Sequence, residues 1–370
     1  MKELEALALM SNRYGADSRY VLAGGGNTSY KSSDRLWVKG SGTALATIRP
    51  EDFVVLERAA LDKMWNAQYP EDEAKREAAV LADMMNARIE GENRRPSVET
   101  LLHNLFPQNY ILHVHPTIVN GITCSKEAEK AMLRLFPDAV WVDACKPGYI
   151  LALECKRMME DYKARTGKDV QILFLQNHGI FFAADTTQEV DALAEGVMDT
   201  LDKAVNRKPN LEPCDYDEDK VAAITAVLQK LYGENQPAAV AFTVCPEVLG
   251  YDPTTKSLSP DHIVYAKAKQ LAVPADAEQA QMEKLFAAFV AENGYKPKIV
   301  FVKDLGMFAC GMSAQEAATA QDVMLDAVKV VAYAESFGGV QVMPDFLIDF
   351  ILNWEVESYR SKVSLSGASS

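Results

Sequence analysis

Residues 172–189 read ILFLQNHGIFFAADTTQE, and residues 299–316 read IVFVKDLGMFACGMSAQE. Isoleucine, phenylalanine, glycine, glutamine and glutamate recur at matching places, and a helical pattern follows both segments. An apolar strand, a turn and a helix that recur at one constant offset predict an α/β chain with a diverged internal duplication. A chance likeness between two strand–turn–helix units is the alternative. The copies differ at one chemically important place, where the first has His178 and the second has Leu305.

A shorter repeat and a change of composition mark the organisation of the rest of the chain. Residues 50–54, PEDFV, resemble residues 260–264, PDHIV, which we interpret as a second trace of the duplication. Residues 208–220 are polar and acidic with two prolines, and therefore predict a linker. The expected domains are residues 1–207 and 221–370, joined by the linker at 208–220.

The first half alternates helical and strand patterns. Strands are predicted over residues 35–39, 53–56, 110–115, 139–142 and 170–175. Helices are predicted over residues 3–14, 97–106, 126–136, 150–163 and 187–205. The acidic segment 71–90 is consistent with either a helix or an exposed excursion.

Composition and charge limit the function classes. The chain has 370 residues, of which 48% are hydrophobic, and a net charge of −14. That charge argues against nucleic acid or an anionic membrane surface as the main partner, although a locally basic site could still bind a small phosphorylated substrate. No apolar run approaches the ~18 residues of a membrane span, and the acidic, amphipathic N-terminus does not resemble a signal peptide. Six cysteines without a C-x-x-C pair predict reduced, mostly buried thiols, and we expect a cytoplasmic protein.

The strongest local signal is ILHVHP at residues 111–116. In a strand, residues i and i+2 point to the same face, so His113 and His115 should present two imidazoles side by side. Two histidines on one sheet face are poor core material but good zinc ligands. A catalytic zinc ion typically takes three protein ligands and keeps one position open, so a third ligand must come from elsewhere.

The other histidines are His103, His178 and His262. His178 is the best third ligand, because it follows an apolar strand in an N-H-G turn that can project a ring from the sheet edge. His103 lies four residues after Glu99, on the same helix face, and we expect it to pack or to support a ligand. We expect only a local role for His262, which lies in the second half.

Glu99 is the carboxylate of most interest. It sits at the start of the predicted helix, where a carboxylate often acts only as a dipole or cap partner. The backbone amides there also favour anions, and Ser97 adds a hydroxyl group. Position alone favours the capping role.

The stretch VLAGGGNTSY at residues 21–30 predicts an anion-binding loop. Glycine lets the backbone approach an anion closely. Ser29 stands where the third glycine of a dinucleotide fingerprint would be, and no lysine follows at P-loop spacing, so we do not expect a nucleotide. Asn27 then becomes the informative residue, as a donor to the phosphate or another oxygen of a substrate.

Five motifs together resemble the class II aldolase/adducin family over most of residues 1–205. They are GNTS at 26–29, KGSG at 39–42, PSVE at 96–99 with His103, HVHP at 113–116 and NHG at 177–179. The second half, with SPDHIVYAK, GMFACG and WEVESYRSK, resembles the aldolase portion of long bacterial rhamnulose-1-phosphate aldolase/dehydrogenase fusions. No strand-linked G-x-G-x-x-G motif occurs, so we expect the dehydrogenase part to be absent.

This resemblance implies a three-layer α/β/α domain with a mainly antiparallel central sheet, followed by a smaller, diverged α/β module. It also implies a homo-oligomer, usually a tetramer with sites between subunits. By the same resemblance, His113, His115 and His178 hold zinc or another divalent metal, and Glu99 is the catalytic acid/base. The implied pocket for the substrate's phosphate consists of Gly26, Asn27, Ser41, Gly42 and Ser97.

The implied activity is that of a zinc-dependent lyase. Such an enzyme would cleave a ketose 1-phosphate, resembling rhamnulose 1-phosphate, to dihydroxyacetone phosphate and an aldehyde. Three neutral imidazoles leave zinc its full charge as a Lewis acid, and a nearby carboxylate can move the proton. The alternatives are a sugar-phosphate 4-epimerase or dehydratase on the same fold, and a non-catalytic adducin-like binding protein. The second half, which lacks the histidine trio, could itself be a non-catalytic module.

Three features depart from the family pattern. Val98 stands where a second serine often precedes the glutamate, which removes a hydroxyl donor to the phosphate. The insertion at residues 64–95 is longer than in short family members. A tyrosine near the family's C-terminus can protonate the leaving aldehyde; Tyr359 is the candidate, with packing in the last helix as the alternative.

Overall fold

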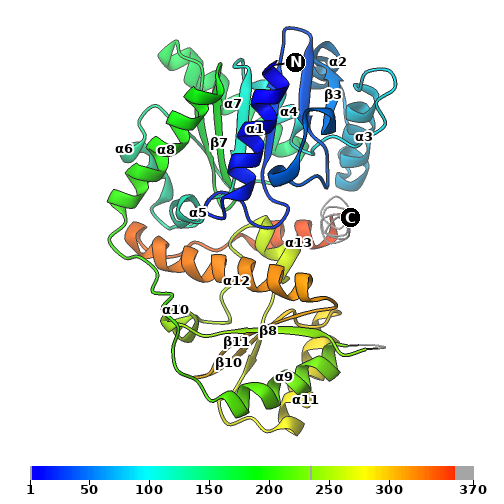
Figure 1. The fold of residues 1–370 in the computed structure, drawn as a ribbon. Coiled ribbons are helices and arrows are strands. Elements are labelled where there is room, and N and C mark those ends of the chain that lie inside the picture. The colour runs from blue at the N-terminus through cyan, green and yellow to red at the C-terminus, as the bar shows by residue number, and fades with distance from the viewer. Residues whose placement is uncertain (1, 234–235, 355–370) are drawn as a thin grey trace. The chain divides into compact units, whose positions relative to one another are not determined.

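The computed structural model describes residues 2–233 and 236–354, which Figure 1 shows as a coloured ribbon. Tyr359 lies outside the described residues. The chain divides into two compact units. The first is built from residues 2–123 and 127–204, and the second from Cys124–Lys126 and the described residues after 204. Across this part of the chain, no helix is long and apolar enough to cross a bilayer.

The described part of the first unit is organised around a seven-stranded sheet in the order β3-β2-β1-β4-β7-β6-β5. Its strands are β1 (Asn27–Lys31), β2 (Arg35–Lys39), β3 (Phe53–Glu57), β4 (Tyr110–Val114), β5 (Val140–Val142), β6 (Ile172–Leu175) and β7 (Gly179–Ala184). Neighbouring strands are antiparallel, except that β5 and β6 run parallel. The central strands β4 and β7 are buried along their whole length, which explains their nearly continuous apolar sequences.

Helices cover both faces of this sheet. They are α1 (Lys2–Ala16), α2 (Arg58–Lys63), α3 (Glu73–Asn86), α4 (Thr100–Leu105), α5 (Thr117–Thr123), α6 (Ala128–Leu135), α7 (Tyr149–Thr166) and α8 (Thr187–Ala204). Side chains of α3, α4 and α7 share one apolar core with alternate residues of the strands. Helices α1, α5 and α8 contact the sheet at β1, β4 and β7 (Figure 1). This three-layer arrangement around a mainly antiparallel sheet confirms the predicted fold class.

The second unit is a smaller α/β module. In its described residues, a four-stranded sheet has the order β8-β11-β10-β9. The strands are β8 (Ala239–Thr243), β9 (Leu271–Val273), β10 (Ile299–Val302) and β11 (Gly306–Gly311). The helices are α9 (Glu218–Tyr232), α10 (Pro246–Gly250), α11 (Gln279–Asn293), α12 (Ala314–Ala334) and α13 (Asp345–Asn353), and residues His262–Ala266 form a π-helical turn.

The second unit repeats part of the first, element for element. Strands β10 and β11 and the start of α12 follow β6, β7 and the start of α8 at the same offset as the two sequence segments. The turns between the paired strands match as well, since Asn177 and Asp304 both have positive φ, at 53° and 58°. Strand directions agree throughout: β9 is parallel to β10, and β11 is antiparallel to both β10 and β8. The order β8-β11-β10-β9 therefore reproduces β4-β7-β6-β5.

Strand register extends this match to β4 and β8. His113 of β4 pairs with Phe181 of β7, and Phe242 of β8 pairs with Phe308 of β11. Positions 181 and 308 correspond in the repeat, so Phe242 takes the place of His113. The ring contact is retained, because His113 stacks on Phe181 with centroids 4.0 Å apart and Phe242 contacts Phe308 at 4.8 Å.

The other two histidines of the first unit are also replaced in the second. Val244 lies two residues after Phe242, as His115 lies two residues after His113. Leu305 occupies the turn position of His178, and its side chain is buried in the apolar core of the second unit. Three apolar residues therefore stand in the second unit where the first has three imidazoles.

Several predicted boundaries need correction. The glycine-rich stretch 21–30 is not a loop throughout, because β1 begins at Asn27 and pairs with β2 and β4. The predicted strand 110–115 ends at Val114, and the predicted helix 97–106 begins at Thr100. The ambiguous acidic segment 71–90 contains the helix α3, whose first turn is capped by the Asp72 carboxylate.

The prediction that residues 50–54 and 260–264 are a second trace of the duplication is wrong. Residues Pro50–Asp52 form a 3-10 turn that leads into strand β3. Residues 260–264 lead instead into the π-helical turn. The likeness of the two pentapeptides does not reflect a common structure.

Candidate metal centre and active site

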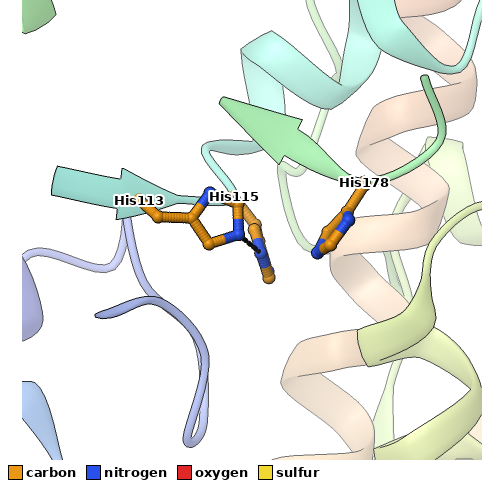
Figure 2. A group of neighbouring side chains, drawn as sticks. All are labelled: His113, His115 and His178. Carbon is orange, nitrogen blue, oxygen red and sulfur yellow. Dashed lines mark hydrogen bonds between the residues drawn. The ribbon is translucent and has the colours of Figure 1, made fainter. Parts of the chain in front are cut away.

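Three histidines of the first unit meet where the end of β4 lies beside the turn between β6 and β7. His113 lies on the buried central strand β4, and its side chain is fully buried. His115 lies just beyond the end of that strand, and His178 lies in the turn between β6 and β7. One ring nitrogen from each residue lies within 4.8 Å of the others. Figure 2 shows the rings turned toward a common space.

The tautomer of His113 is set by the neighbouring strand. Its Nδ1 lies 2.9 Å from the carbonyl oxygen of Ile180 on β7 and can only donate there. In the neutral ring, Nε2 then keeps its lone pair, which faces His115, whose Nε2 is 3.0 Å away. A histidine oriented in this way is typical of metal ligands, which commonly donate the other ring N–H to a carbonyl or carboxylate.

The turn that carries His178 is tightly constrained. Gly179 follows it, and a β-carbon at that position would lie 2.5 Å from Cδ2 of His115 and 2.6 Å from the carbonyl oxygen of Val114. Such distances are too short for any residue other than glycine. The N-H-G sequence therefore has a packing reason, because glycine lets β7 approach the chain at His115.

Glu99 faces the three histidines. It immediately precedes α4, but its side chain makes no capping hydrogen bond to that helix. Its Oε1 lies 3.2 Å from Nε2 of His113 and 3.6 Å from Nε2 of His178. Burial opposes ionisation, but the imidazoles of His113 and His178 and the amide of Asn27 hold the pKa of Glu99 well below its usual range. The side chain is therefore a buried carboxylate directed at the histidine cluster and not a helix cap.

Asn27 connects Glu99 to a fourth histidine of the first unit. Its Nδ2 lies 2.5 Å from Oε2 of Glu99, and its Oδ1 contacts Nε2 of His103. The other ring nitrogen of His103 lies 2.7 Å from Oγ of Ser29. Burial lowers the pKa of His103 to about 3, so this ring is neutral at neutral pH. The spacing of Glu99 and His103 indicated a shared helix face, but no sequence pattern indicated that Asn27 joins them.

The residues expected to bind phosphate lie on three segments that contact one another. Gly26 precedes β1, Ser41 and Gly42 follow β2, and Ser97 precedes α4. Lys39, at the end of β2, donates from Nζ to the carbonyl oxygen of Gly26 at 3.0 Å, and its own carbonyl oxygen accepts from the N–H of Ser97 at 3.2 Å.

The two ends of this group are held by the backbone. The N–H of Ser41 donates to the carbonyl oxygen of Arg95 at 2.8 Å. Gly26 has a φ of 70°, and a β-carbon there would lie 3.0 Å from the carbonyl oxygen of His113. The glycine loop therefore lies against the strand that carries His113. Buried Lys39, which holds that loop, belongs to the KGSG motif but was not among the residues expected to bind phosphate.

His262 belongs to the second unit and is not one of the three clustered histidines. Its Nε2 is 3.0 Å from Oδ2 of Asp326 on α12, and both side chains are buried. This local pairing agrees with the role expected for it.

Two comparisons extend into the second unit. The family model for the second domain of class II aldolases matches residues 290–357. A curated Bacillus subtilis (strain 168) protein, named "Uncharacterized oxidoreductase YuxG", is 21% identical over 97% of this chain. The chain spans only 58% of the length of that relative.

Solved structures similar to this chain match about half of it. A class II aldolase domain from Thermoplasma acidophilum is 24% identical, with a TM-score of 0.47, and the match covers 54% of this chain and 92% of that one. L-fuculose-1-phosphate aldolase from Thermus thermophilus is 15% identical, with a TM-score of 0.35, and the match covers 55% of this chain and 92% of that one. The family model described as "Class II Aldolase and Adducin N-terminal domain" matches residues 5–204, more than half of the sequence. The chain belongs to the class II aldolase and adducin family.

Proposed function

We propose that this protein is a divalent-metal-dependent lyase that cleaves a ketose 1-phosphate to dihydroxyacetone phosphate and an aldehyde. The observation that carries the proposal is the distance of 3.2 Å between Oε1 of Glu99 and Nε2 of His113, an atom that carries a lone pair when the ring is neutral. Oε1 of Glu99 is buried and accepts no hydrogen bond among the described residues. A carboxylate oxygen and a nitrogen lone pair repel one another at this distance, and with the further imidazoles around them they are better suited to binding a cation.

Zinc is the metal that we propose for this site. Three imidazole nitrogens suit zinc, and imidazole is also a common ligand of iron. His113, His115 and His178 would hold the ion. When bound, the ion supplies Lewis-acid stabilisation of the negative charge that develops on the substrate's oxygens.

Glu99 is the proposed acid/base. In the cleavage direction the C4 hydroxyl group loses its proton as the C3–C4 bond breaks; the ionised carboxylate of Glu99 takes up a proton and delivers it to C3. In the condensation direction the carboxylate removes that proton from C3 of dihydroxyacetone phosphate, and the aldehyde oxygen is protonated. Its low pKa is consistent with the ionised form as the resting state. Burial matters for this role, because the exclusion of bulk water keeps solvent from exchanging the proton that Glu99 and the substrate pass between them.

The glycine loop and its neighbours form the proposed phosphate pocket. Gly26, Asn27, Ser41, Gly42 and Ser97 lie on the three contacting segments, and Nζ of Lys39 donates a hydrogen bond to the loop at Gly26. One N–H of the Asn27 amide is committed to Glu99, so the other is the one proposed to reach the substrate. Val98 removes a hydroxyl donor, so backbone N–H groups would carry more of the phosphate's hydrogen bonds.

We also propose a division of labour along the chain. Residues 1–207 would form the catalytic domain, and residues 208–220 a linker that ends in the first turn of α9. Residues 221–370 would form a non-catalytic copy that has lost the histidines. Phe242, Val244 and Leu305 at the three ligand positions support this assignment. Assembly into a homo-oligomer is proposed from family membership.

The direct test is a panel of ketose 1-phosphates, with rhamnulose 1-phosphate first, assayed with and without zinc. Release of dihydroxyacetone phosphate is followed by its NADH-coupled reduction, and the unphosphorylated ketoses serve as matched controls. We expect release that needs the metal and falls sharply when the phosphate is absent.

Other outcomes would identify another function. Epimerised sugar phosphate without released dihydroxyacetone phosphate would replace the lyase by a 4-epimerase. Stoichiometric metal with no reaction on any sugar phosphate would point to a binding protein, and protein purified without chelator that holds no divalent metal would remove the basis of the proposal.

A further inference from the structure

A continuous chain of buried hydrogen bonds leads from Ser29 to Glu99. The groups are Oγ of Ser29, both ring nitrogens of His103, the amide of Asn27 and Oε2 of Glu99. Ser29 and His103 are fully buried, and Asn27 and Glu99 are each only 7% exposed. Because little water can reach them, these groups must satisfy one another.

The chemistry of each group determines which atom donates and which accepts in each hydrogen bond of this series. A carboxylate only accepts hydrogen bonds, so the Asn27 NH2 group must face Glu99 and its Oδ1 must face His103. Oδ1 also only accepts, so the Nε2 of His103 must carry the proton. In the neutral ring Nδ1 is then an acceptor, and the Ser29 hydroxyl must donate to it.

His103 is held firmly enough to impose this direction. It lies on α4 one turn after Glu99, and its backbone N–H donates to the carbonyl oxygen of Glu99 at 3.0 Å. Its ring also packs edge-on against Phe181, the residue on which the metal-cluster histidine His113 stacks. The same packing layer therefore supports both the histidine cluster and the hydrogen-bond chain.

We propose that His103 and Ser29 are positioning residues that lock the Asn27 amide in the one orientation that donates to Glu99. With Oε2 held by Asn27, Oε1 is the oxygen left to face His113 and His178. Without the His103 donor, the Asn27 amide can turn over and present its oxygen to the carboxylate, which repels it and moves Glu99 out of position. This role deepens the proposed function and rests on it for its kinetic consequence only.

The hydrogen-bond chain can be tested without any substrate. In protein labelled with 15N at its five histidines, side-chain NMR reports the tautomer of each ring, and His103→Gln identifies the His103 signal by its loss. We expect His103 to be neutral and protonated at Nε2 from pH 8 down to about pH 5. A ring protonated at Nδ1, or a charged ring at neutral pH, would overturn the hydrogen-bond chain whatever reaction the protein catalyses.

The positioning role is tested by kinetics on a substrate that the wild type turns over. His103→Leu should lower kcat on the order of 100-fold, with KM and bound metal unchanged, because only the orientation of Glu99 is lost. His103→Gln, whose amide can donate to Asn27 and accept from Ser29, should recover kcat to within about tenfold of wild type. If His103→Leu does not fold, Ser29→Ala provides the second variant, with kcat lowered by roughly tenfold and metal retained.

Matched controls separate positioning from general damage. His262→Gln removes a buried histidine that is paired with an acid in the second unit, and it should leave kcat unchanged. A wild-type kcat in His103→Leu, or a failure of His103→Gln to exceed His103→Leu, would overturn the positioning role. If the wild type cleaves no sugar phosphate, the lyase proposal fails, and the NMR result still decides whether the chain exists.

Discussion

Gly179 lies so close to His115 that a β-carbon on it would be 2.5 Å from Cδ2 of the imidazole. The same atom would lie 2.6 Å from the carbonyl oxygen of Val114. Gly179→Ala must therefore displace the His115 ring or separate β7 from the end of β4. We expect metal affinity to fall by roughly tenfold or more, since second-sphere changes at metal sites have effects of this size. Metal titration of the purified variant, with a thermal melt to monitor folding, checks this.

Gly196 offers the matched control. It lies on the exposed face of α8, and a β-carbon there would meet nothing within 4 Å. Gly196→Ala should leave metal binding unchanged and stabilise the protein by roughly 0.5–1 kcal/mol, because glycine is unfavourable inside a helix. Equal metal affinity in the two variants would show that the close contact at Gly179 does not shape the cluster.

Removal of one histidine should discriminate between the two units. His178→Ala takes away one of the three nitrogens of the cluster, so the purified protein should lose most of its metal. His262→Ala, in the second unit, should leave the metal content unchanged, although it leaves the carboxylate of Asp326 without its imidazole partner. Elemental analysis of protein purified without chelator gives the metal per chain. Equal losses in both variants would contradict the choice of ligands.

The sequence was sufficient for the parts of the fold that depend on local pattern. The recurring strand, turn and helix after residues 172 and 299 are present at the predicted places. The match of β8 to β4 was not visible, because ILHVHP and VAFTVC share little, and only the shared pairing with Phe181 and Phe308 aligns them. Register is a property of two strands together, so one segment cannot reveal it.

The site was predictable where its residues are neighbours along one element. It was less predictable where strand pairing brings together residues that are far apart in the sequence. The two histidines of ILHVHP lie together as expected, although His115 falls beyond the strand end. Asn27 appeared to belong to a glycine loop, because three glycines precede it. Pairing of β1 with β4 sets Asn27 opposite His113, and this antiparallel contact brings its amide to Glu99. No local signal could indicate that pairing.

Glu99→Gln tests the proposed acid/base separately from the metal. The three imidazoles remain, so bound metal should stay at the wild-type level, while turnover should fall by about 100- to 10,000-fold, the usual range for general acid–base catalysis. Glu57→Gln changes an exposed carboxylate paired with Arg35 and should leave both quantities unchanged. Steady-state kinetics with metal analysis of the same samples gives the answer. Normal turnover in Glu99→Gln would mean that this carboxylate carries no proton in the reaction.

An ion pair in the second unit provides a pH-dependent test of stability. Oε1 of Glu316 lies 2.6 Å from Nζ of Lys298, and its Oε2 accepts from the N–H of Met312 at 2.9 Å. Burial raises the pKa of Glu316, but Lys298 and that N–H outweigh it and hold the pKa below its usual value. Because the native state binds the proton less tightly than the unfolded state, the contribution of the carboxylate is present above the unfolded pKa and disappears as pH falls through the native one.

Glu316→Gln should therefore lower the free energy of unfolding by about 1.5–3 kcal/mol at neutral pH, the usual range for hydrogen bonds to a charged group. The difference from wild type should shrink as pH falls below the unfolded pKa of Glu316. Glu292→Gln, at an exposed pair with Lys269, should be close to wild type at every pH. Urea unfolding at a series of pH values measures all three proteins. A deficit in Glu316→Gln that is constant with pH would show that the side chain stabilises the second unit by packing and not by its charge.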